Sequence, residues 1–181
     1  MVEALMEPEA MAHLAELAAQ VPADQAILEI GTYHAANLVN MAQAAKQGGG
    51  AHVYGVDAYG QGDIYPGRPH MLARYTTQDE QIARDHIRAN HLVRATTLIV
   101  NTSTQAAKTY NGPPIALLVI DGEHRYHAVI NDYRAWQPHL TLNATIAFDD
   151  YGGKHGAEVI TAVKDLGLTV NLIGTRMAIT Q

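Results

Sequence analysis

The sequence contains no cysteine among its 181 residues. Disulfides, zinc sites built on thiolates and a cysteine nucleophile are therefore excluded. Any metal must be bound by carboxylates, imidazoles or carbonyl oxygens. Basic residues are also scarce, because 12 Lys and Arg stand against 18 Asp and Glu, for a formal net charge of −6. This balance provides no basic surface for nucleic acid and no attraction to anionic membranes, so neither is expected as a partner.

Long apolar runs are absent as well. No apolar stretch approaches the roughly 20 residues that cross a bilayer. The first residues, MVEALMEPEAMAHLAELAAQ, carry acids where a secretory signal carries bases. The expected location is therefore the cytoplasm. No linker, repeat or low-complexity segment divides the chain, and its length suits one domain over 1–181 that buries a substantial core.

Strand and helix patterns alternate along the chain. Short apolar runs predict strands at 26–30, 52–56, 96–100, 115–120 and 141–148. Helical spacing predicts helices at 8–20, 35–47, 76–92, 103–109, from after Asp121 to Trp136, and at 156–166. A terminal hairpin is expected from 169–173 and 176–180, joined through Gly174. Parallel crossovers then dominate, so the predicted fold is α/β, a Rossmann-like doubly wound sheet of about seven strands, mostly parallel with a C-terminal antiparallel hairpin.

One segment, 58–74, interrupts this alternation. Its glycines, prolines and tyrosines are too irregular for a helix or a strand, and it is long for an ordinary loop. Loops of this length are usually functional or disordered. Two interpretations stay open: a lid that closes over substrate, with Tyr59 among its contacts, or a surface excursion.

Polar residues gather where the predicted parallel strands end. Ligands of such sheets bind beyond the carboxyl ends of the strands. A carboxylate at such a position is costly unless it is hydrated, paired or bound to a ligand. Because five of the seven residues concerned are acids, we expect a functional site at this edge. The seven residues are Glu29, Gly31, Asp57, Asn101, Asp121, Asp149 and Asp150.

The turn after the first strand, Glu29-Ile30-Gly31-Thr32-Tyr33, favours a nucleotide-like ligand. Gly31 permits a close approach of the backbone, and the following helix begins with exposed amides. A dinucleotide enzyme would have G-x-G-x-x-G here, and only the first glycine is present. Asp57, at the end of the second strand, suits the two hydroxyls of a ribose. The alternative is a capped turn in a solvated loop.

These residues resemble the class I S-adenosylmethionine methyltransferases. In that family the first strand ends in E-x-G-x-x-x-G-x-S, and the acid of the second strand binds the cofactor ribose. Glu29, Gly31 and Asp57 match, whereas Ala35 replaces the second glycine and Asn37 the serine. The resemblance implies S-adenosylmethionine as cofactor, bound by Glu29, Gly31, Thr32, Tyr33, Asp57, Asn101 and Asp121.

The second half of the chain carries a more specific resemblance. The segment LLVIDGEHRYHAVINDYRAWQPHLTLNATIAFDDY, at 117–151, is similar to a branch with D-G-x-H-x-Y, then D-x-x-x-W, then a strand that ends in D-D. That branch includes sugar and macrolide O-methyltransferases and proteins of the cephalosporin-hydroxylase type. In the branch, the position of His124 carries the proposed general base.

Physical reasoning predicts a metal at the same place. If the fourth and fifth strands are neighbours, their ends lie roughly 5 Å apart. Asp121, Asp149 and Asp150 then converge, and three carboxylates repel one another unless a cation is present. A divalent ion with oxygen ligands, Mg²⁺ or Mn²⁺, relieves that repulsion. The alternative for Asp150 is a capping or solvent-exposed role.

His124 is the predicted general base. It lies three residues beyond Asp121, about one helical turn if the helix begins at once, so both side chains are expected at the same edge. An imidazole titrates near neutrality and can take the proton of an acceptor hydroxyl. Asp121 is the second predicted catalytic residue. Tyr126 and Trp136 are expected in the core.

The sequence thus predicts an S-adenosylmethionine-dependent and Mg²⁺-dependent O-methyltransferase that acts on a hydroxyl of a small sugar, polyol or phenol. Two alternatives stay open: a nucleotide-binding oxidoreductase or hydroxylase-like enzyme on the same sheet, and a non-catalytic module that only binds the cofactor. The expected partner is a small-molecule acceptor, and self-association into a homo-oligomer is left open. Without a cap domain, the acceptor pocket must come from 58–74, from the first helix or from a neighbouring subunit.

Overall fold

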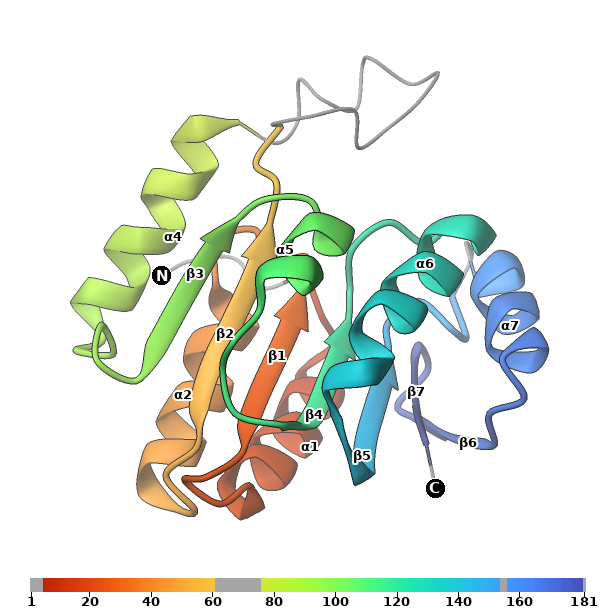
Figure 1. Cartoon of the computed structure of the whole chain (residues 1–181), viewed down its shortest axis with the longest axis horizontal. Coiled ribbons are helices and arrows are strands. Elements are labelled where there is room, and N and C mark those ends of the chain that lie inside the picture. The colour runs from red at the N-terminus through yellow and green to blue at the C-terminus, as the bar shows by residue number, and fades with distance from the viewer. Residues whose placement is uncertain (1–4, 61–75, 154–155, 181) are drawn as a thin grey trace.

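A single seven-stranded sheet organises the chain in the computed structural model, which describes residues 5–60, 76–153 and 156–180 (Figure 1). The strand order is β3-β2-β1-β4-β5-β7-β6. The first five strands are parallel, and β7 runs antiparallel to both β5 and β6. The predicted fold class, with its terminal hairpin, is therefore confirmed. The strands are β1 (Ala26–Ile30), β2 (His52–Asp57), β3 (Thr96–Val100), β4 (Ile115–Ile120), β5 (Leu140–Phe148), β6 (Val170–Ile173) and β7 (Met177–Thr180).

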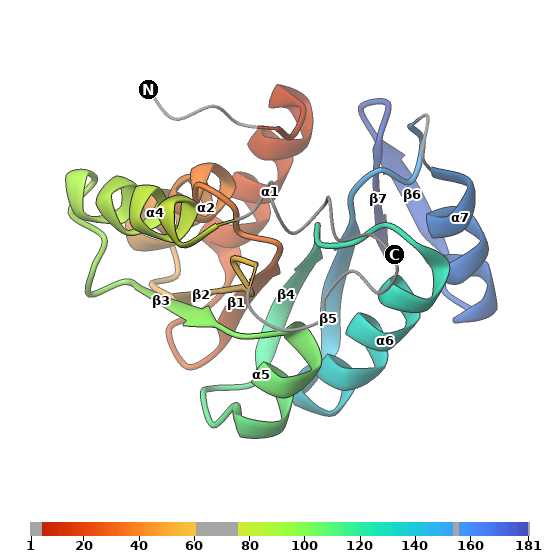
Figure 2. The ribbon, with the colours of Figure 1, turned by 90° about the horizontal axis from the view of Figure 1, so that it is seen from above.

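Helices cover both faces of this sheet (Figure 2). One face carries α1 (Pro8–Gln20), α2 (Ala36–Gln47) and α4 (Thr77–Ala89). The other carries α5 (Ser103–Thr109), α6 (Tyr126–Trp136) and α7 (Gly156–Asp165), with a short 3₁₀ turn at Gln137–His139. Among the described helices, none combines the length and apolar character needed to cross a bilayer.

The chain has two hydrophobic cores, one on each face of the sheet, and the apolar strands contribute side chains to both. In β1 and β4 every residue except Ala116 is buried, as is usual for strands covered on both faces. Successive side chains alternate between faces, so Leu117 and Val119 pack toward α1 and α2, while Leu118 and Ile120 pack toward α6 and α7. The sheet is therefore held between two separate hydrophobic layers.

Local signals set the helix ends. Thr76 and Asp79 form a capping box at the start of α4, in which Thr76 Oγ1 accepts from the amide of Gln78 at 3.2 Å and Asp79 Oδ2 accepts from the amide of Thr76 at 2.7 Å. The same helix ends at Ala89, short of the predicted residue 92. His91 there has a φ of 57°, which a helix cannot continue through.

One predicted boundary is wrong in a way that affects the site. The helix after β4 begins at Tyr126, with Arg125 as its N-cap, and not directly after Asp121. His124 therefore lies in the loop between β4 and α6, and the proposed helical spacing from Asp121 does not apply. The segment 61–75 lies outside the described residues, and with it most of the predicted lid.

The strand register brings the predicted site residues to one edge. Backbone hydrogen bonds step across the carboxyl ends of the parallel strands: Asn101 donates to Asp57, Gly31 to Val56 and Asp121 to Ile30. Asp149 continues the series by donating to Ile120 at 3.0 Å. This edge is at the top of Figure 1, where the arrowheads of the first five strands lie.

Candidate active site

Gly31 allows the turn after β1 to lie against the turn after β4. Its φ is 87°, a conformation that favours glycine. A Cβ at this position would lie 2.1 Å from the carbonyl oxygen of Asp121, far inside van der Waals contact. Gly31 therefore serves a close approach between two turns of the same chain. Its predicted role in cofactor binding remains a prediction.

Asp57 joins two strained turns. Its Oδ2 accepts from the amide of Tyr33 and its Oδ1 from the amide of Tyr59, both at 2.9 Å. Both tyrosines have a φ of 45°, which non-glycine residues rarely adopt. Burial raises the pKa of Asp57, and the amides of Tyr59, Tyr33 and Thr32 oppose that rise. A carboxylate offers about four acceptor positions and three amides are directed at this one, so Asp57 keeps an acceptor position for a ribose hydroxyl.

Tyr59 has a structural role that the sequence did not indicate. Substrate contact was one of the two interpretations left open for its segment, but its side chain is buried and its hydroxyl donates to the carbonyl of Tyr33 at 2.7 Å. Burial, with the charge of Asp57, raises the pKa of this hydroxyl. Tyr59 therefore holds the turn after β1 in place.

Glu29 lies inside β1, and only one of its two carboxylate oxygens has a hydrogen-bond partner among the described residues. Its Oε1 accepts from Asn37 Nδ2 at 2.8 Å, and burial raises its pKa well above the usual value. Three buried atoms in this neighbourhood have no hydrogen-bond partner among the described residues: Glu29 Oε2, Asn37 Oδ1 and Thr32 Oγ1. Buried polar atoms are normally paired, so this set fits a ligand that brings hydrogen-bond donors. Asn37 stands where the related family has serine, and the sequence had not selected it as a ligand contact.

Asn101 occupies the end of β3, as predicted, but its side chain caps the next turn. The residue is exposed, and its Oδ1 accepts from the amide of Thr102 at 2.8 Å. Its predicted role in cofactor binding remains a prediction.

A compact group of two carboxylates and an imidazole lies beyond β4 and β5. Asp121, His124 and Asp149 each offer a ligand atom, and these atoms lie within 4.8 Å of one another. Burial raises the pKa of Asp149 to about 7, and the charges of Asp121 and Asp150 add to the shift. Oxygen ligands with one imidazole suit Mg²⁺ or Mn²⁺, so these residues fit the expected divalent ion.

Asp150, the third predicted metal ligand, is held differently. Its Oδ1 accepts from Arg176 Nε at 2.7 Å and also from Nη2 of the same side chain. Its Oδ2 lies 3.0 Å from His124 Nδ1. Asp150 is buried, so its carboxylate does not point to solvent. The role of Asp150 as a metal ligand remains a prediction. Arg176, which lies in the turn between β6 and β7, was not selected from the sequence as a site residue.

His124 faces the carboxylates from the loop before α6. Its Nε2 is buried, lies 3.6 Å from Asp121 Oδ1 and has no hydrogen-bond partner among the described residues. Burial lowers the pKa of this imidazole, but Asp121, Asp150 and Asp149 outweigh that effect and the pKa is raised. The loop therefore achieves the proximity to Asp121 that the sequence had attributed to a helical turn.

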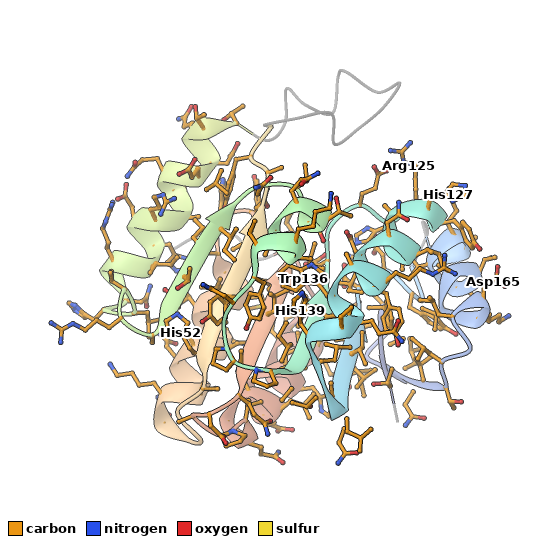
Figure 3. The ribbon with its side chains drawn as sticks, in the orientation of Figure 1. His52, Arg125, His127, Trp136, His139 and Asp165 are labelled. Carbon is orange, nitrogen blue, oxygen red and sulfur yellow. The ribbon has the colours of Figure 1, made fainter. Side chains whose placement is uncertain are left out.

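Two aromatic residues of α6, Tyr126 and Trp136, make structural contacts. Trp136 is fully buried, as predicted, and its Nε1 donates to Ser103 Oγ at 3.0 Å. Tyr126 is only partly buried, and its hydroxyl donates to Asp165 Oδ2 at 2.9 Å, which ties α6 to α7. Figure 3 shows His127 near the first turn of α6 and Trp136 near its last turn, beside His139.

The strand order, the antiparallel β7 and a site at the carboxyl edge define a Rossmann-like methyltransferase fold. The sequence agrees with this class, because the model of a methyltransferase domain family matches residues 28–151. That match covers more than half of the chain, and the chain belongs to the methyltransferase domain family.

Individual relatives are distant. The O-methyltransferase NovP is 14% identical with a TM-score of 0.77 over 100% of this chain and 82% of its own. The calicheamicin methyltransferase CalS11 is 20% identical with a TM-score of 0.67 over 95% of this chain and 77% of its own. At these identities the likeness establishes the fold. The uncharacterized protein y4gI of Sinorhizobium fredii is 29% identical over 127 residues, which are 68% of this chain and 13% of that protein. The chain thus matches only a small part of that curated relative's length.

Proposed function

We propose that this chain is an O-methyltransferase that uses S-adenosylmethionine and a divalent ion, Mg²⁺ or Mn²⁺, to methylate a hydroxyl of a small sugar, polyol or phenol. The observation that carries the proposal is the group of Asp121, His124 and Asp149, whose ligand atoms lie within 4.8 Å at the edge that also carries Asp57. Methyl transfer to a hydroxyl needs a bound methyl donor and a group that accepts a proton, and this edge offers residues for both.

The cofactor would be held by residues of β1 and β2. Asp57 supports binding of a ribose, because its oxygens retain lone pairs beside the turn that Gly31 permits. The unpartnered atoms of Glu29, Thr32 and Asn37 support binding of a donor-rich group such as the methionine ammonium. When bound, S-adenosylmethionine supplies an electrophilic methyl group.

The metal would be held by Asp121 and Asp149, with Asp150 as the third ligand expected from the sequence. When bound, the ion polarises the acceptor hydroxyl and orients its oxygen. His124 takes the proton of that hydroxyl at Nε2, the nitrogen without a partner among the described residues. The raised pKa of Asp149 supports a cation here, because a positive charge relieves the repulsion between the carboxylates.

Calorimetry with S-adenosylhomocysteine and a turnover assay over hydroxyl acceptors test the proposal. We expect micromolar binding of the product cofactor, and methylation that stops when a chelator removes the divalent ion. Absence of cofactor binding would refute the proposal. Binding without turnover on any acceptor would favour the non-catalytic module instead. The family assignment already disfavours the oxidoreductase alternative.

A further inference from the structure

A cavity of about 620 Å³ lies at the amino edge of the sheet, at the opposite end from the candidate active site. Its walls are the turn from α2 to β2 and the turn from α4 to β3. In Figure 1 this edge is where β2 and β3 begin, away from their arrowheads. Pockets that hold small molecules have volumes of about 300–1,000 Å³, so the cavity has room for one. The basic side chains that line it are Lys46, His52, Arg88, His91 and Arg94.

Both walls of the cavity are held by hydrogen bonds. The amide of Gly50 donates to a carbonyl of α2 at 2.8 Å, and the amide of Ala95 donates to the carbonyl of Leu92 at 2.8 Å. Gln43 Nε2 donates to Asn90 Oδ1 at 3.0 Å and so joins α2 to the residue that follows α4. The cavity is therefore formed before any ligand binds.

The charges around the cavity are all of one sign. Three of the chain's 12 Lys and Arg line it, and none of its lining residues is acidic. The last turn of a helix favours cations, which accounts for Lys46 in α2 and Arg88 in α4. Arg94 lies outside both helices, so their ends do not account for its position. The group is a local excess of positive charge on a chain with a net charge of −6.

Two of the three cations have no partner within the described ranges 5–60, 76–153 and 156–180. Lys46 and Arg94 make no side-chain hydrogen bond or ion pair there. Arg88 Nη1 contacts Asp85 Oδ1 at 2.7 Å, but both side chains are more than half exposed. Exposed pairs of this kind contribute little to stability, so Arg88 can exchange its partner for another anion. Positive charges around one cavity repel one another, and a bound anion relieves that repulsion.

We propose that this cavity binds a small molecule that carries one or more phosphate groups. The planar fork of Arg and the point charge of Lys both suit phosphate oxygens. A phosphate or diphosphate carries more negative charge than a single carboxylate, which matches three cations. Ala51, Val93 and Ala95 also line the cavity, and Val93 is 60% exposed, so they suit the organic part of such a ligand. The site lies away from the proposed methyl transfer and does not rest on it.

Calorimetry with inorganic diphosphate tests the proposal on the full chain, freed of cofactor and divalent ions. We expect a dissociation constant below about 1 mM at low ionic strength, rising as salt is added. Lys46→Met combined with Arg94→Met should lower the affinity at least about tenfold. The matched control combines Lys164→Met with Arg134→Met, which are exposed on α7 and α6, and it should bind as wild type does. No binding by wild type, or equal losses in both double variants, would overturn the proposal.

Thermal unfolding shows whether the double variants fold, as their exposed positions lead us to expect. If the Lys46 and Arg94 double variant does not fold, the single variant Arg94→Gln carries the test. It removes one charge and should lower the affinity for diphosphate at least about threefold. Wild-type affinity in Arg94→Gln would contradict the proposal.

Amide NMR locates the bound diphosphate. We expect shifts in the signals of Gly50, His91 and Ala95, and none in those of Gly31 and Asp121. Shifts confined to the carboxyl edge of the sheet would overturn the proposal. Citrate spreads its charge over three separated carboxylates and should bind at least about threefold more weakly than diphosphate. Equal affinity for citrate would overturn the assignment to phosphate.

Calorimetry with S-adenosylhomocysteine separates this site from the proposed function. The Lys46 and Arg94 double variant should keep its affinity for S-adenosylhomocysteine within about twofold of wild type, because the two sites lie at opposite edges of the sheet. If wild type binds diphosphate at the cavity but no S-adenosylhomocysteine, this proposal stands and the proposed function fails. If wild type binds S-adenosylhomocysteine but no diphosphate, this proposal alone fails.

Discussion

Asp57 combines a structural and a ligand-binding task in one carboxylate. Its two oxygens accept from the amides of Tyr33 and Tyr59, and the same oxygens suit a ribose. We expect Asp57→Ala to weaken S-adenosylhomocysteine binding by about 1–3 kcal/mol, the usual cost of losing a charge-assisted hydrogen bond. Calorimetry measures the change, and Asp24→Ala, in the exposed turn before β1, is the control. An unaltered affinity would remove Asp57 from the cofactor site.

Substitution of His124 should affect the rate of catalysis and leave cofactor binding almost unchanged. A positioned general base contributes about 10²–10⁴-fold to rate. We therefore expect His124→Ala to lower kcat by that order while leaving cofactor affinity nearly intact. Steady-state kinetics and calorimetry on the same preparations check this. His127 is exposed on α6, so His127→Ala serves as the control. A kcat near that of wild type in His124→Ala would leave Asp121 as the base.

At the scale of elements, the contact between the β1 turn and the β4 turn depends on one missing Cβ. Gly31→Ala would place a methyl group 2.1 Å from the carbonyl oxygen of Asp121, so the turns must separate. Gly167 also has a positive φ, 71°, but an added Cβ there meets nothing within 4 Å. We expect Gly167→Ala to lower the free energy of unfolding by about 1 kcal/mol, from backbone strain alone.

Gly31→Ala should lower the free energy of unfolding by at least about 2 kcal/mol more than Gly167→Ala does, and it should also weaken cofactor binding. Denaturant unfolding of the two variants gives the comparison. Equal losses would show that the close approach of the turns contributes little to stability.

At the scale of the whole molecule, a buried acid on α6 links stability to pH. Burial raises the pKa of Asp132 to about 6, a hydrogen bond with Ser103 opposes the rise and Glu123 adds to it. The usual pKa of the unfolded state is about 4, so the native protein binds the extra proton between about pH 4 and pH 6. The stability that comes from this bound proton is fully present below pH 4 and is lost as the pH rises through 6.

This shift corresponds to about 3 kcal/mol at most. Asp132→Asn removes the charge and keeps the shape, so it should be about 1–3 kcal/mol more stable than wild type at pH 7.5 and equal to it near pH 4. Denaturant unfolding across this pH range measures the difference. Asp24→Asn, in an exposed turn, should follow wild type throughout. Parallel curves for wild type and Asp132→Asn would contradict the linkage.

The sequence by itself determined the order of the elements. Predicted segments 96–100, 103–109 and 115–120 coincide with β3, α5 and β4, because apolar runs bounded by polar residues and turn residues have a local cause. The acids at the strand ends followed from the same pattern, since parallel strands finish at one edge. Asp121 and Asp149 could thus be assigned to one site before their contacts were known.

Only the tertiary structure decided how these side chains are used. Arg176 contacts Asp150 across 26 positions of sequence, and Tyr59 donates to Tyr33 across another 26. No local pattern encodes such pairs, because they depend on where a hairpin turn or a strained loop comes to lie. His124 reaches Asp121 through a loop and not through a helical turn, so the prediction of proximity was correct although its stated reason was wrong. The fold class depends on periodicity, which is local, whereas the orientation of the site depends on contacts between distant turns.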